Sequence, residues 1–387
     1  MRSSDCYIGL MSGTSVDAVD ALVAQFDDAS DRPTIHAVHS HAPPAALRAR
    51  LLSLSEPSQR LSLVEFGQLD QAIGEWFGEA ARLAIDKAGL DAAHIRAIGS
   101  HGQTVWHAPD DRYAFSLQIG AASRIAAMTG CDVVSDFRNA DIALGGQGAP
   151  LVCACHGALF GTSNQNRAVI NIGGIANITI LPAGADRTPE TITGFDTGPG
   201  NGLMDAWIAR HRGQDYDADG EWARGGRVDA ALLEHLQTDP YFARMPPKST
   251  GREYFGLDWL DRYLNKYEGR ALDSADVQAT LCELTAATIA DAVKRFAPGV
   301  EHIYLCGGGI RNQYLFDRIS ALVAPCPVAG TDELGIDPAW IEALAFAWLA
   351  RQRVLGRPGN APGVTGACHA TVLGGLHSAP RRAIKPR

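Results

Sequence analysis

Hydrophobic positions near the N-terminus predict two strands joined by a glycine turn. Residues 6–11 are mostly apolar, and Val16 to Val23 alternates apolar and polar residues at a period of two, which is typical of strands. Between them, residues 12–15 read Ser-Gly-Thr-Ser and carry no bulky side chain. Such a turn exposes N–H groups and hydroxyls that can bind a phosphate. An ordinary tight turn explains this one hairpin equally well.

A second hairpin repeats the device in the middle of the chain. Residues 169–180 place Gly173 and Gly174 between two strongly apolar segments. Each hairpin opens one half of the chain. The pair therefore favours a duplicated architecture that closes on a nucleotide over two unrelated turns.

The remaining periodic segments follow a similar order in each half. The first half predicts strands over 34–41, 94–99 and 132–136 and helices over 45–54, 61–88 and 121–129. The second half predicts strands over 168–182, 191–196 and 302–306 and helices over 201–212, 274–296 and 310–324. This order matches the half-unit of actin-like and sugar-kinase folds. The predicted class is α/β, a two-domain actin-like ATPase (RNase H-like) fold with duplicated mixed sheets flanked by helices and a nucleotide cleft between them.

No low-complexity linker separates the two halves. We expect residues 1–140, joined by the C-terminal residues 365–387, to form the N-terminal subdomain. Residues 141–364 are expected to form the C-terminal subdomain. A chain of 387 residues is long enough for two domains of ordinary size.

Composition excludes several classes of protein. The formal charge is −9 and no basic stripe is evident, which argues against a nucleic-acid partner. No apolar run approaches the ~20 residues that span a bilayer, and we expect neither a membrane segment nor a signal peptide. Eight scattered cysteines then predict reduced thiols and a cytoplasmic location. The run Cys153-Ala154-Cys155-His156 lies in an apolar stretch, so packing is favoured there over a structural metal.

Asp196 is the strongest candidate for chemistry. It ends a predicted strand within Gly194 to Asn201, just before a predicted helix. The free N–H groups of a helix N-terminus suit an anion, and a carboxylate beside it can act as a base or hold a metal. The alternative is that Asp196 or Asn201 merely caps the helix.

A third glycine junction follows the predicted strand 302–306. Three glycines, Gly307 to Gly309, allow close approach of a flat group such as adenine or ribose; a plain turn would need only one. Other nucleotide and hydrolase signatures are missing from the sequence: there is no Gly-x-x-x-x-Gly-Lys-Ser/Thr loop, no convincing dinucleotide-binding fingerprint and no Gly-x-Ser-x-Gly elbow.

Three polar residues stand where an apolar core would not favour them. His101 follows a predicted buried strand, and Arg138 suits bidentate binding of a carboxylate. Glu342 lies in an apolar helical segment and needs a partner, either an arginine or a ligand hydroxyl. A satisfied core histidine and a surface ion pair remain the alternatives for His101 and Arg138. His107 and Lys248 have no assigned role.

Taken together, these segments closely resemble the anhydro-N-acetylmuramic acid kinases, a branch of the superfamily of actin, heat-shock chaperone ATPases and sugar kinases. The resemblance extends over nearly the whole chain. The matching stretches are Gly9–Asp17, Ser100–Thr104, Asp136–Pro150, Asn171–Asn177, Gly194–Asn201, Cys306–Asn312 and Asn360–Ala367.

The resemblance implies ATP-dependent hydrolytic opening of the 1,6-anhydro ring of 1,6-anhydro-N-acetylmuramic acid with phosphorylation of O6. The products would be N-acetylmuramic acid 6-phosphate and ADP, in the recycling of cell-wall peptidoglycan. Asp196 would be the catalytic base that activates water, and Arg138, Glu342 and His101 would bind the sugar. The expected ATP-binding residues are Gly13, Thr14, Ser15, Val16, Asp17, Ala18, Val19, Asp20, Gly173, Gly174, Gly198, Gly200, Asn201, Gly307, Gly308, Gly309 and Asn312.

One position departs from the wider superfamily and leaves the metal ligands open. The first loop there usually carries an Asp two residues before the Gly-Thr pair, and Met11 stands in that position. Mg²⁺ is still expected with ATP, and Asp17, Asp20 and Asp196 are its candidate ligands. A homodimer is one candidate for the oligomeric state. Two other functions stay open: an actin-like or chaperone-like ATPase switch, and a kinase for an ordinary hexose.

Overall fold

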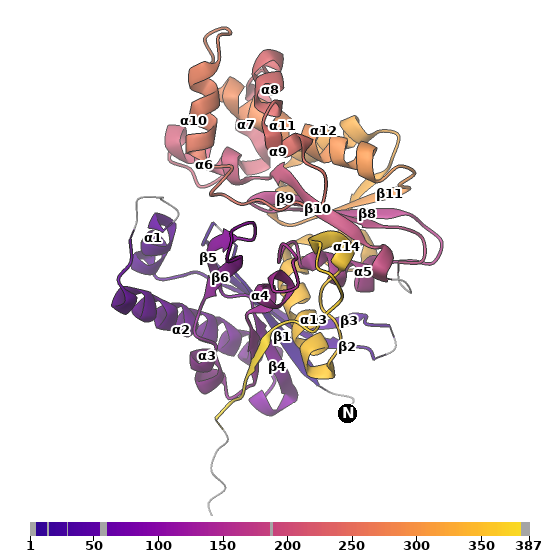
Figure 1. The fold of residues 1–387 in the computed structure, drawn as a ribbon. Coiled ribbons are helices and arrows are strands. Elements are labelled where there is room, and N and C mark those ends of the chain that lie inside the picture. The colour runs from indigo at the N-terminus through magenta and orange to yellow at the C-terminus, as the bar shows by residue number, and fades with distance from the viewer. Residues whose placement is uncertain (1–4, 14, 29, 55–59, 186–188, 381–387) are drawn as a thin grey trace, which may run out of the picture. The chain divides into compact units, whose positions relative to one another are not determined.

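A computed structural model describes residues 5–13, 15–28, 30–54, 60–185 and 189–380. These residues fall into two compact units (Figure 1). Unit 1 comprises residues 1–155, 342–362 and 366–387, and unit 2 comprises residues 156–341 and 363–365.

A mixed sheet forms the centre of unit 1, in the order β13-β7-β4-β1-β2-β3. Its strands are β1 (Cys6–Met11), β2 (Val19–Phe26), β3 (Pro33–His41), β4 (Ile95–Ser100), β7 (Val133–Ser135) and β13 (Gly375–His377). The first three strands are antiparallel neighbours. Strand β4 joins β1 in parallel, β7 joins β4 in parallel, and β13 pairs with β7 antiparallel.

The sheet of unit 2 repeats this pairing in the order β10-β9-β8-β11-β12. Its strands are β8 (Arg167–Ile172), β9 (Ile175–Leu181), β10 (Thr193–Pro199), β11 (His302–Cys306) and β12 (Val328–Gly330). Again the first three strands are antiparallel, and the last two add in parallel beside the first. The predicted duplication of mixed sheets is confirmed, while the nucleotide cleft between domains stays a prediction.

The boundary between the units differs from the expected one at 140/141. Helix α4 (Phe137–Ile142) and the loop after it stay with unit 1 because the fully buried Asp141 carboxylate holds them there. Its oxygens accept the Gly148 N–H at 2.8 Å and the Asn360 amide at 2.7 Å. Both partners belong to unit 1.

Helix α13 (Ile341–Leu355) also lies in unit 1, almost entirely, although its sequence falls inside the expected C-terminal subdomain. It packs directly on the sheet at two glycines. A Cβ on Gly9 would lie 1.7 Å from the Ala343 carbonyl oxygen, and one on Gly99 would lie 2.0 Å from the Phe346 carbonyl oxygen. Such contact is open only to residues without a side chain.

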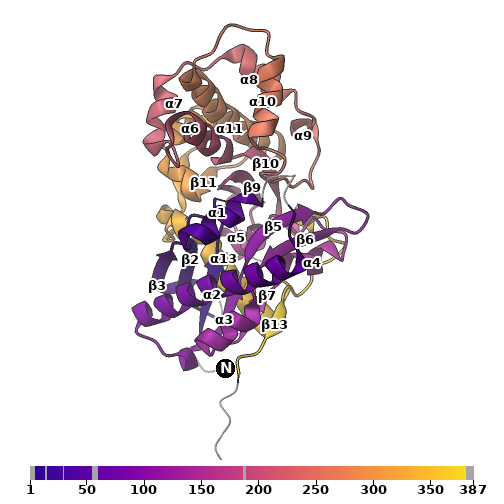
Figure 2. The ribbon, with the colours of Figure 1, turned by 90° about the vertical axis from the view of Figure 1, so that its left-hand side faces the viewer.

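The longest helix of unit 1, α2 (Leu63–Ala88), begins and ends where its sequence signals it should. Ser62 and Glu65 form a capping box, and Gly89 closes the helix in the left-handed conformation at φ 66°. Its apolar face packs on β2, β3 and α3 (Ala122–Thr129) (Figure 2). Trp76 and Phe77 are the largest side chains that it buries. Helix α1 (Ala45–Ser53) precedes it.

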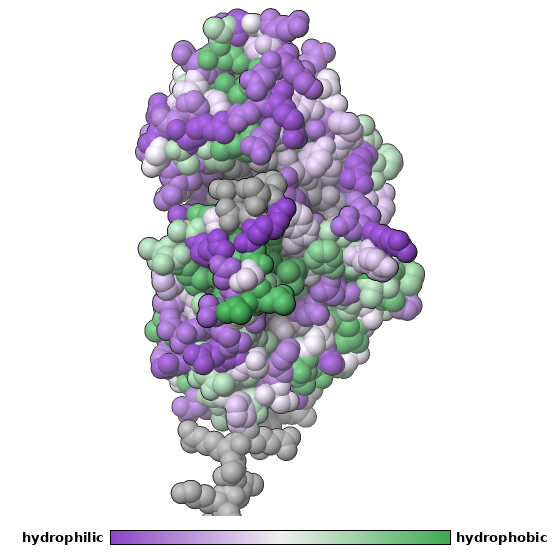
Figure 3. Space-filling model, turned by 60° about the vertical axis from the view of Figure 1, so that its left-hand side comes forward, coloured by the Kyte–Doolittle hydropathy of each residue, from purple (hydrophilic) through white to green (hydrophobic). Residues whose placement is uncertain are grey.

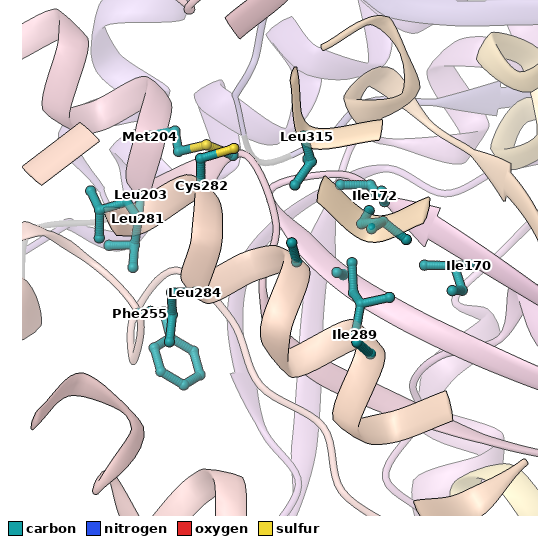
Figure 4. Packing of buried hydrophobic residues seen from close by; sticks show 14 of the residues in the cluster. Ile170, Ile172, Leu203, Met204, Phe255, Leu281, Cys282, Leu284, Ile289 and Leu315 are labelled. Carbon is teal, nitrogen blue, oxygen red and sulfur yellow. The ribbon is translucent and has the colours of Figure 1, made fainter. Parts of the chain in front are cut away.

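Helix α11 (Ser274–Phe296) is the centre of unit 2 and packs against β9, β10, α6 (Gly202–Arg212) and α12 (Gln313–Val323). Figure 4 shows Leu281, Leu284 and Ile289 of this helix beside Ile170 and Ile172 of β8. Because α11 is apolar on nearly all sides, it lies in the interior. The predicted helix over 274–296 is confirmed.

Several elements were not predicted. In unit 1 they are the hairpin β5 (Gln103–Ala108) and β6 (Phe115–Ile119). In unit 2 they are short helices, α7 (Glu221–Gly225), α8 (Ala230–Gln237), α9 (Pro240–Ala243) and α10 (Leu257–Lys266). Helix α5 (Val152–Phe160) contains the cysteine run. Its Cys153 and Cys155 are buried and its His156 bonds to the Thr179 hydroxyl at 2.7 Å, as packing residues do.

Surface polarity is uneven. On the face shown in Figure 3, hydrophobic residues (green) gather in one area among hydrophilic ones (purple). At the start of α2, Leu63 is 90% exposed and Val64 is 69% exposed. Exposed apolar side chains of this size are typical of surfaces that a partner covers, and the homodimer stays a prediction. Within the described residues, no helix has the length and apolarity needed to cross a membrane.

Candidate functional site

The turn between β1 and β2 is held in shape from two sides. The Val16 N–H donates to the Gly13 carbonyl at 3.3 Å, and the Gln103 amide donates to the same oxygen at 3.2 Å. Val16 adopts φ 54° with its side chain buried, a strained conformation for a β-branched residue that its packing must support. The predicted phosphate turn is therefore a built structure. Thr14, one of its expected ATP ligands, lies outside the described residues.

Two candidate metal ligands of this turn already have partners. Asp17 accepts from the Arg48 guanidinium at 2.7 Å, and the same arginine donates to the Val16 carbonyl at 3.3 Å. Asp20 accepts a hydrogen bond from the Ser40 hydroxyl. Among the residues that the structure describes, no group of three or more His, Cys, Asp or Glu side chains is placed to hold a metal ion.

His101 and Arg138, which the sequence singled out separately, touch each other in unit 1. The Arg138 guanidinium donates to His101 Nε2 at 3.0 Å and to the Gly148 carbonyl at 2.7 Å. Burial, assisted by the charge of Arg138, holds the pKa of His101 well below its usual value. The imidazole is therefore neutral, which is what an acceptor facing a guanidinium must be.

A cavity of about 270 Å³ brings the predicted polar segments of unit 1 together. It lies beyond the carboxyl ends of the parallel strands β4 and β7, where ligands commonly bind in α/β sheets. Its polar lining comes from five elements or their ends. The lining residues are Asp70, Gln71, Ser100, His101, Gly102, Gln118, Gly120, Ala121, Ala122, Ser123, Ser135, Asp136 and His377.

Glu342 stands in the first turn of α13 and is half-buried. A carboxylate is favoured there because the N-terminal N–H groups of a helix carry partial positive charge. The close packing of α13 on Gly9 and Gly99 fixes the position of this turn in unit 1.

Asp196 of unit 2 lies buried in β10 and is held by one segment, residues 241–250. The Thr250 N–H donates to Asp196 Oδ2 at 2.9 Å, and the Asp196 N–H donates to the Lys248 carbonyl at 3.2 Å. The Tyr241 hydroxyl donates to the Asp196 carbonyl at 2.7 Å. The capping alternative is wrong for both candidates, because α6 begins at Gly202 and its N-cap, Asn201, makes no side-chain capping bond.

The three glycine junctions of unit 2 meet. The N–H groups of Gly200 and Asn201 donate to the carbonyls of Gly174 and Gly173, at 3.0 and 2.8 Å. Gly307 adopts φ 81°, and a Cβ there would lie 2.5 Å from the Asn171 amide oxygen. A side chain on either Gly200 or Gly307 would separate these turns. Gly198 has φ 149° and faces the Phe242 ring, whereas nothing lies within 4 Å of a Cβ on Gly308.

Beside the glycines 307–309 lies a surface depression of about 520 Å³ that the sequence did not reveal. The Gly307 N–H donates to the Pro338 carbonyl at 3.0 Å and joins its two walls. The lining residues are Ile310, Arg311, Asp332, Gly335, Asp337, Pro338 and Ala339. Asn312, an expected ATP ligand, caps α12 through its side chain, which accepts the Leu315 N–H at 3.0 Å.

Sequence comparison identifies the family. The family model for anhydro-N-acetylmuramic acid kinase matches residues 5–379. The chain belongs to the anhydro-N-acetylmuramic acid kinase family. It is therefore a kinase, an enzyme that transfers a phosphoryl group.

Relatives in this family align over almost their whole length. The chain is 48% identical over 372 residues to the anhydro-N-acetylmuramic acid kinase of Coxiella burnetii (strain Dugway 5J108-111), covering 96% of this chain and 97% of that one. It is 48% identical over 373 residues to the enzyme of the same name from Shewanella halifaxensis (strain HAW-EB4), covering 96% and 98%. Among solved structures, the activator of the 2-hydroxyisocaproyl-CoA dehydratase from Clostridium difficile with bound ADPNP matches at 14% identity and a TM-score of 0.44, covering 89% and 94%. That likeness adds nothing to the family assignment.

Proposed function

We propose that this enzyme uses ATP to open and phosphorylate 1,6-anhydro-N-acetylmuramic acid. Water adds to C1, the bond from C1 to O6 breaks, and O6 takes the γ-phosphoryl group. The products are N-acetylmuramic acid 6-phosphate and ADP, and the reaction serves the recycling of cell-wall peptidoglycan in the cytoplasm. The observation that carries the proposal is the family match over residues 5–379.

Asp196 is the proposed base, which takes the proton of the attacking water. A base must be held within hydrogen-bond reach of the proton that it removes. The Thr250 N–H on Oδ2 restrains the Asp196 carboxylate in one orientation. A buried carboxylate at a strand end, not used as a helix cap, fits this role.

ATP is proposed to bind to backbone groups at the glycine turns of both units. In unit 1 the binding residues are those of the turn from Gly13 to Asp20. In unit 2 the turns at Gly173–Gly174, Gly198–Asn201 and Gly307–Gly309 contribute, with Asn312 supporting them from the start of α12. The depression beside Gly307–Gly309 offers room for the nucleoside. Phosphoryl transfer depends chiefly on such positioning and on neutralising charge.

The sugar is proposed to bind Arg138, Glu342 and His101 in unit 1. A guanidinium binds a carboxylate with two parallel hydrogen bonds, which suits Arg138 to the lactyl group of the substrate. The neutral His101 accepts from Arg138 and so restrains the plane of the guanidinium. Glu342 is suited to accept hydrogen bonds from sugar hydroxyls.

Mg²⁺ is expected to bind with ATP, where it would neutralise phosphate charge. This ion usually takes only one or two protein carboxylates and keeps several waters, so a cluster of three acids is not required. Asp20 and Asp196 provide the hard oxygen atoms that it prefers. Asp17 fits less well because it already pairs with Arg48 at 2.7 Å.

The test is an ADP-release assay with ATP, Mg²⁺ and one of three sugars: the anhydro sugar, N-acetylmuramic acid or glucose. We expect ADP only with the anhydro sugar, together with a 6-phosphorylated reducing sugar. Run in ¹⁸O-labelled water, the reaction should place one heavy oxygen at C1. Preformed N-acetylmuramic acid 6-phosphate in the same water controls for spontaneous exchange.

Other outcomes would support the two alternatives. Turnover of glucose without label at C1 would indicate a kinase for an ordinary hexose. Slow ATP hydrolysis that no sugar changes would indicate an ATPase switch that acts on a protein partner.

A further inference from the structure

Asp196 owes its position to one short segment, and that segment is closed by a buried lysine. Three hydrogen bonds join residues 241–250 to Asp196, through the Tyr241 hydroxyl, the Lys248 carbonyl and the Thr250 N–H. The Lys248 ammonium donates back to the Tyr241 carbonyl at 3.1 Å. The two ends of the segment that contact Asp196 are therefore tied together by the Lys248 side chain.

Lys248 is only 5% exposed, which is unusual for a lysine. Its Nζ lies 4.6 Å from the centre of the Tyr241 ring and 5.5 Å from the centre of the Phe195 ring. Phe195 is the residue next to Asp196. Aromatic faces attract a cation and offset part of the cost of removing it from water. A residue needed only for packing here would be apolar.

We propose that Lys248 is the positioning residue of the Asp196 carboxylate, acting through the Tyr241 carbonyl, the two aromatic faces and its own positive charge. The inference rests on the proposed role of Asp196 as the base. It assigns Lys248 no contact with the substrate.

The charged groups that face Lys248 come from three elements. Asp196 on β10 and Asp291 on α11 favour the ammonium, whereas Arg295 on α11 and Arg244, just after α9, oppose it. Burial, followed by Arg295, lowers the pKa of Lys248 to about 8. The ammonium is therefore present below pH 8 and is lost above it. A neutral amine would keep one hydrogen bond but lose the attraction to Asp196 and to the rings.

The wild-type pH profile gives the first test, because it needs no variant. We expect kcat to fall on the alkaline side with an apparent pKa of about 8. Lys248→Arg keeps the charge throughout this range because a guanidinium does not deprotonate. Its profile should therefore lose the alkaline limb, whatever its absolute rate. A merely structural lysine would not produce this change of shape.

Lys248→Met removes the charge but keeps an unbranched side chain. We expect kcat to fall about 30-fold at pH 7.5, with the KM values for sugar and ATP changed less than about threefold, since a small misplacement of a reacting group has large effects. Lys266→Met, at an exposed lysine of α10, is the matched control and should behave as wild type. Thermal unfolding and calorimetric ATP binding report on the fold of each variant.

The outcomes separate this inference from the proposed function. A wild-type kcat that stays flat to pH 10, or an alkaline limb that Lys248→Arg retains, would overturn the inference. Wild-type kinetics in Lys248→Met would do the same. An Asp196→Asn variant that keeps turnover within about tenfold would instead remove the base assignment itself, whatever the lysine variants do.

Discussion

The two hairpins that open the two sheets share a topology and differ in their turns. In unit 1 the connection between β1 and β2 runs through residues 12–18, whereas in unit 2 only Gly173 and Gly174 connect β8 to β9. The longer turn carries hydroxyls and is restrained by Gln103. The shorter turn instead accepts the N–H groups of Gly200 and Asn201 with its carbonyls.

This difference teaches that duplication conserved the sheet and left the turns free to specialise. Strand pairing depends on backbone hydrogen bonds along the whole strand, so it tolerates change at the strand ends. The long turn of unit 1 suits the binding of phosphate. The short turn of unit 2 braces the segment that follows Asp196. The third strands differ in the same way, because β10 ends in this braced segment and β3 leads only to α1 on the surface.

The largest effect should come from removing the carboxylate at the end of β10. Asp196→Asn keeps the size of the side chain and should lower kcat by about 10³-fold, within the range for a general base. Calorimetric Kd for ATP should stay within about twofold. Asp258→Asn, at an exposed acid of α10, is the matched control. Equal losses in both variants would mean that unit 2 is not specialised for this chemistry.

The next effect concerns how the sheet of unit 1 receives α13. Gly9→Ala would place a Cβ 1.7 Å from the Ala343 carbonyl oxygen, so strand and helix must move apart. We expect a loss of about 3 kcal/mol in the free energy of unfolding, measured by urea denaturation. Gly67→Ala is the control, since nothing lies within 4 Å of a Cβ there in the exposed start of α2. It should stabilise by about 0.5–1 kcal/mol, and a loss there would contradict the explanation.

The smallest of these effects sharpens the role of unit 1 in binding sugar. Arg138→Lys keeps the charge and loses the planar pair of donors that contacts His101 and Gly148. We expect KM for the anhydro sugar to rise about 30-fold with KM for ATP nearly unchanged, because a lysine cannot bind a carboxylate bidentately. Steady-state kinetics with each substrate varied would measure both values. Arg96→Lys, at an exposed arginine of β4, should change neither, and an equal rise in both KM values would argue against a sugar contact.

Much of this protein was determined by sequence signals that act over a few residues. Alternation in Val16 to Val23, the capping box at Ser62, the all-round apolar helix over 274–296 and the three glycine junctions each predicted local structure that is observed. These signals are readable because side-chain periodicity and turn conformation depend on near neighbours. Short helices within 221–266 were missed because each is too brief to show a period.

Only the tertiary structure decided which distant residues meet. His101 and Arg138 are 37 residues apart, and Asp141 reaches Asn360 across 219 residues. The role of Lys248 depends on a segment that folds back on β10, and its sequence neighbours do not announce this. Such contacts are set by the path of the chain and by the need to pair every buried polar group. Local patterns carry no record of that path, so the residues of the site could be predicted singly, while their pairing could not.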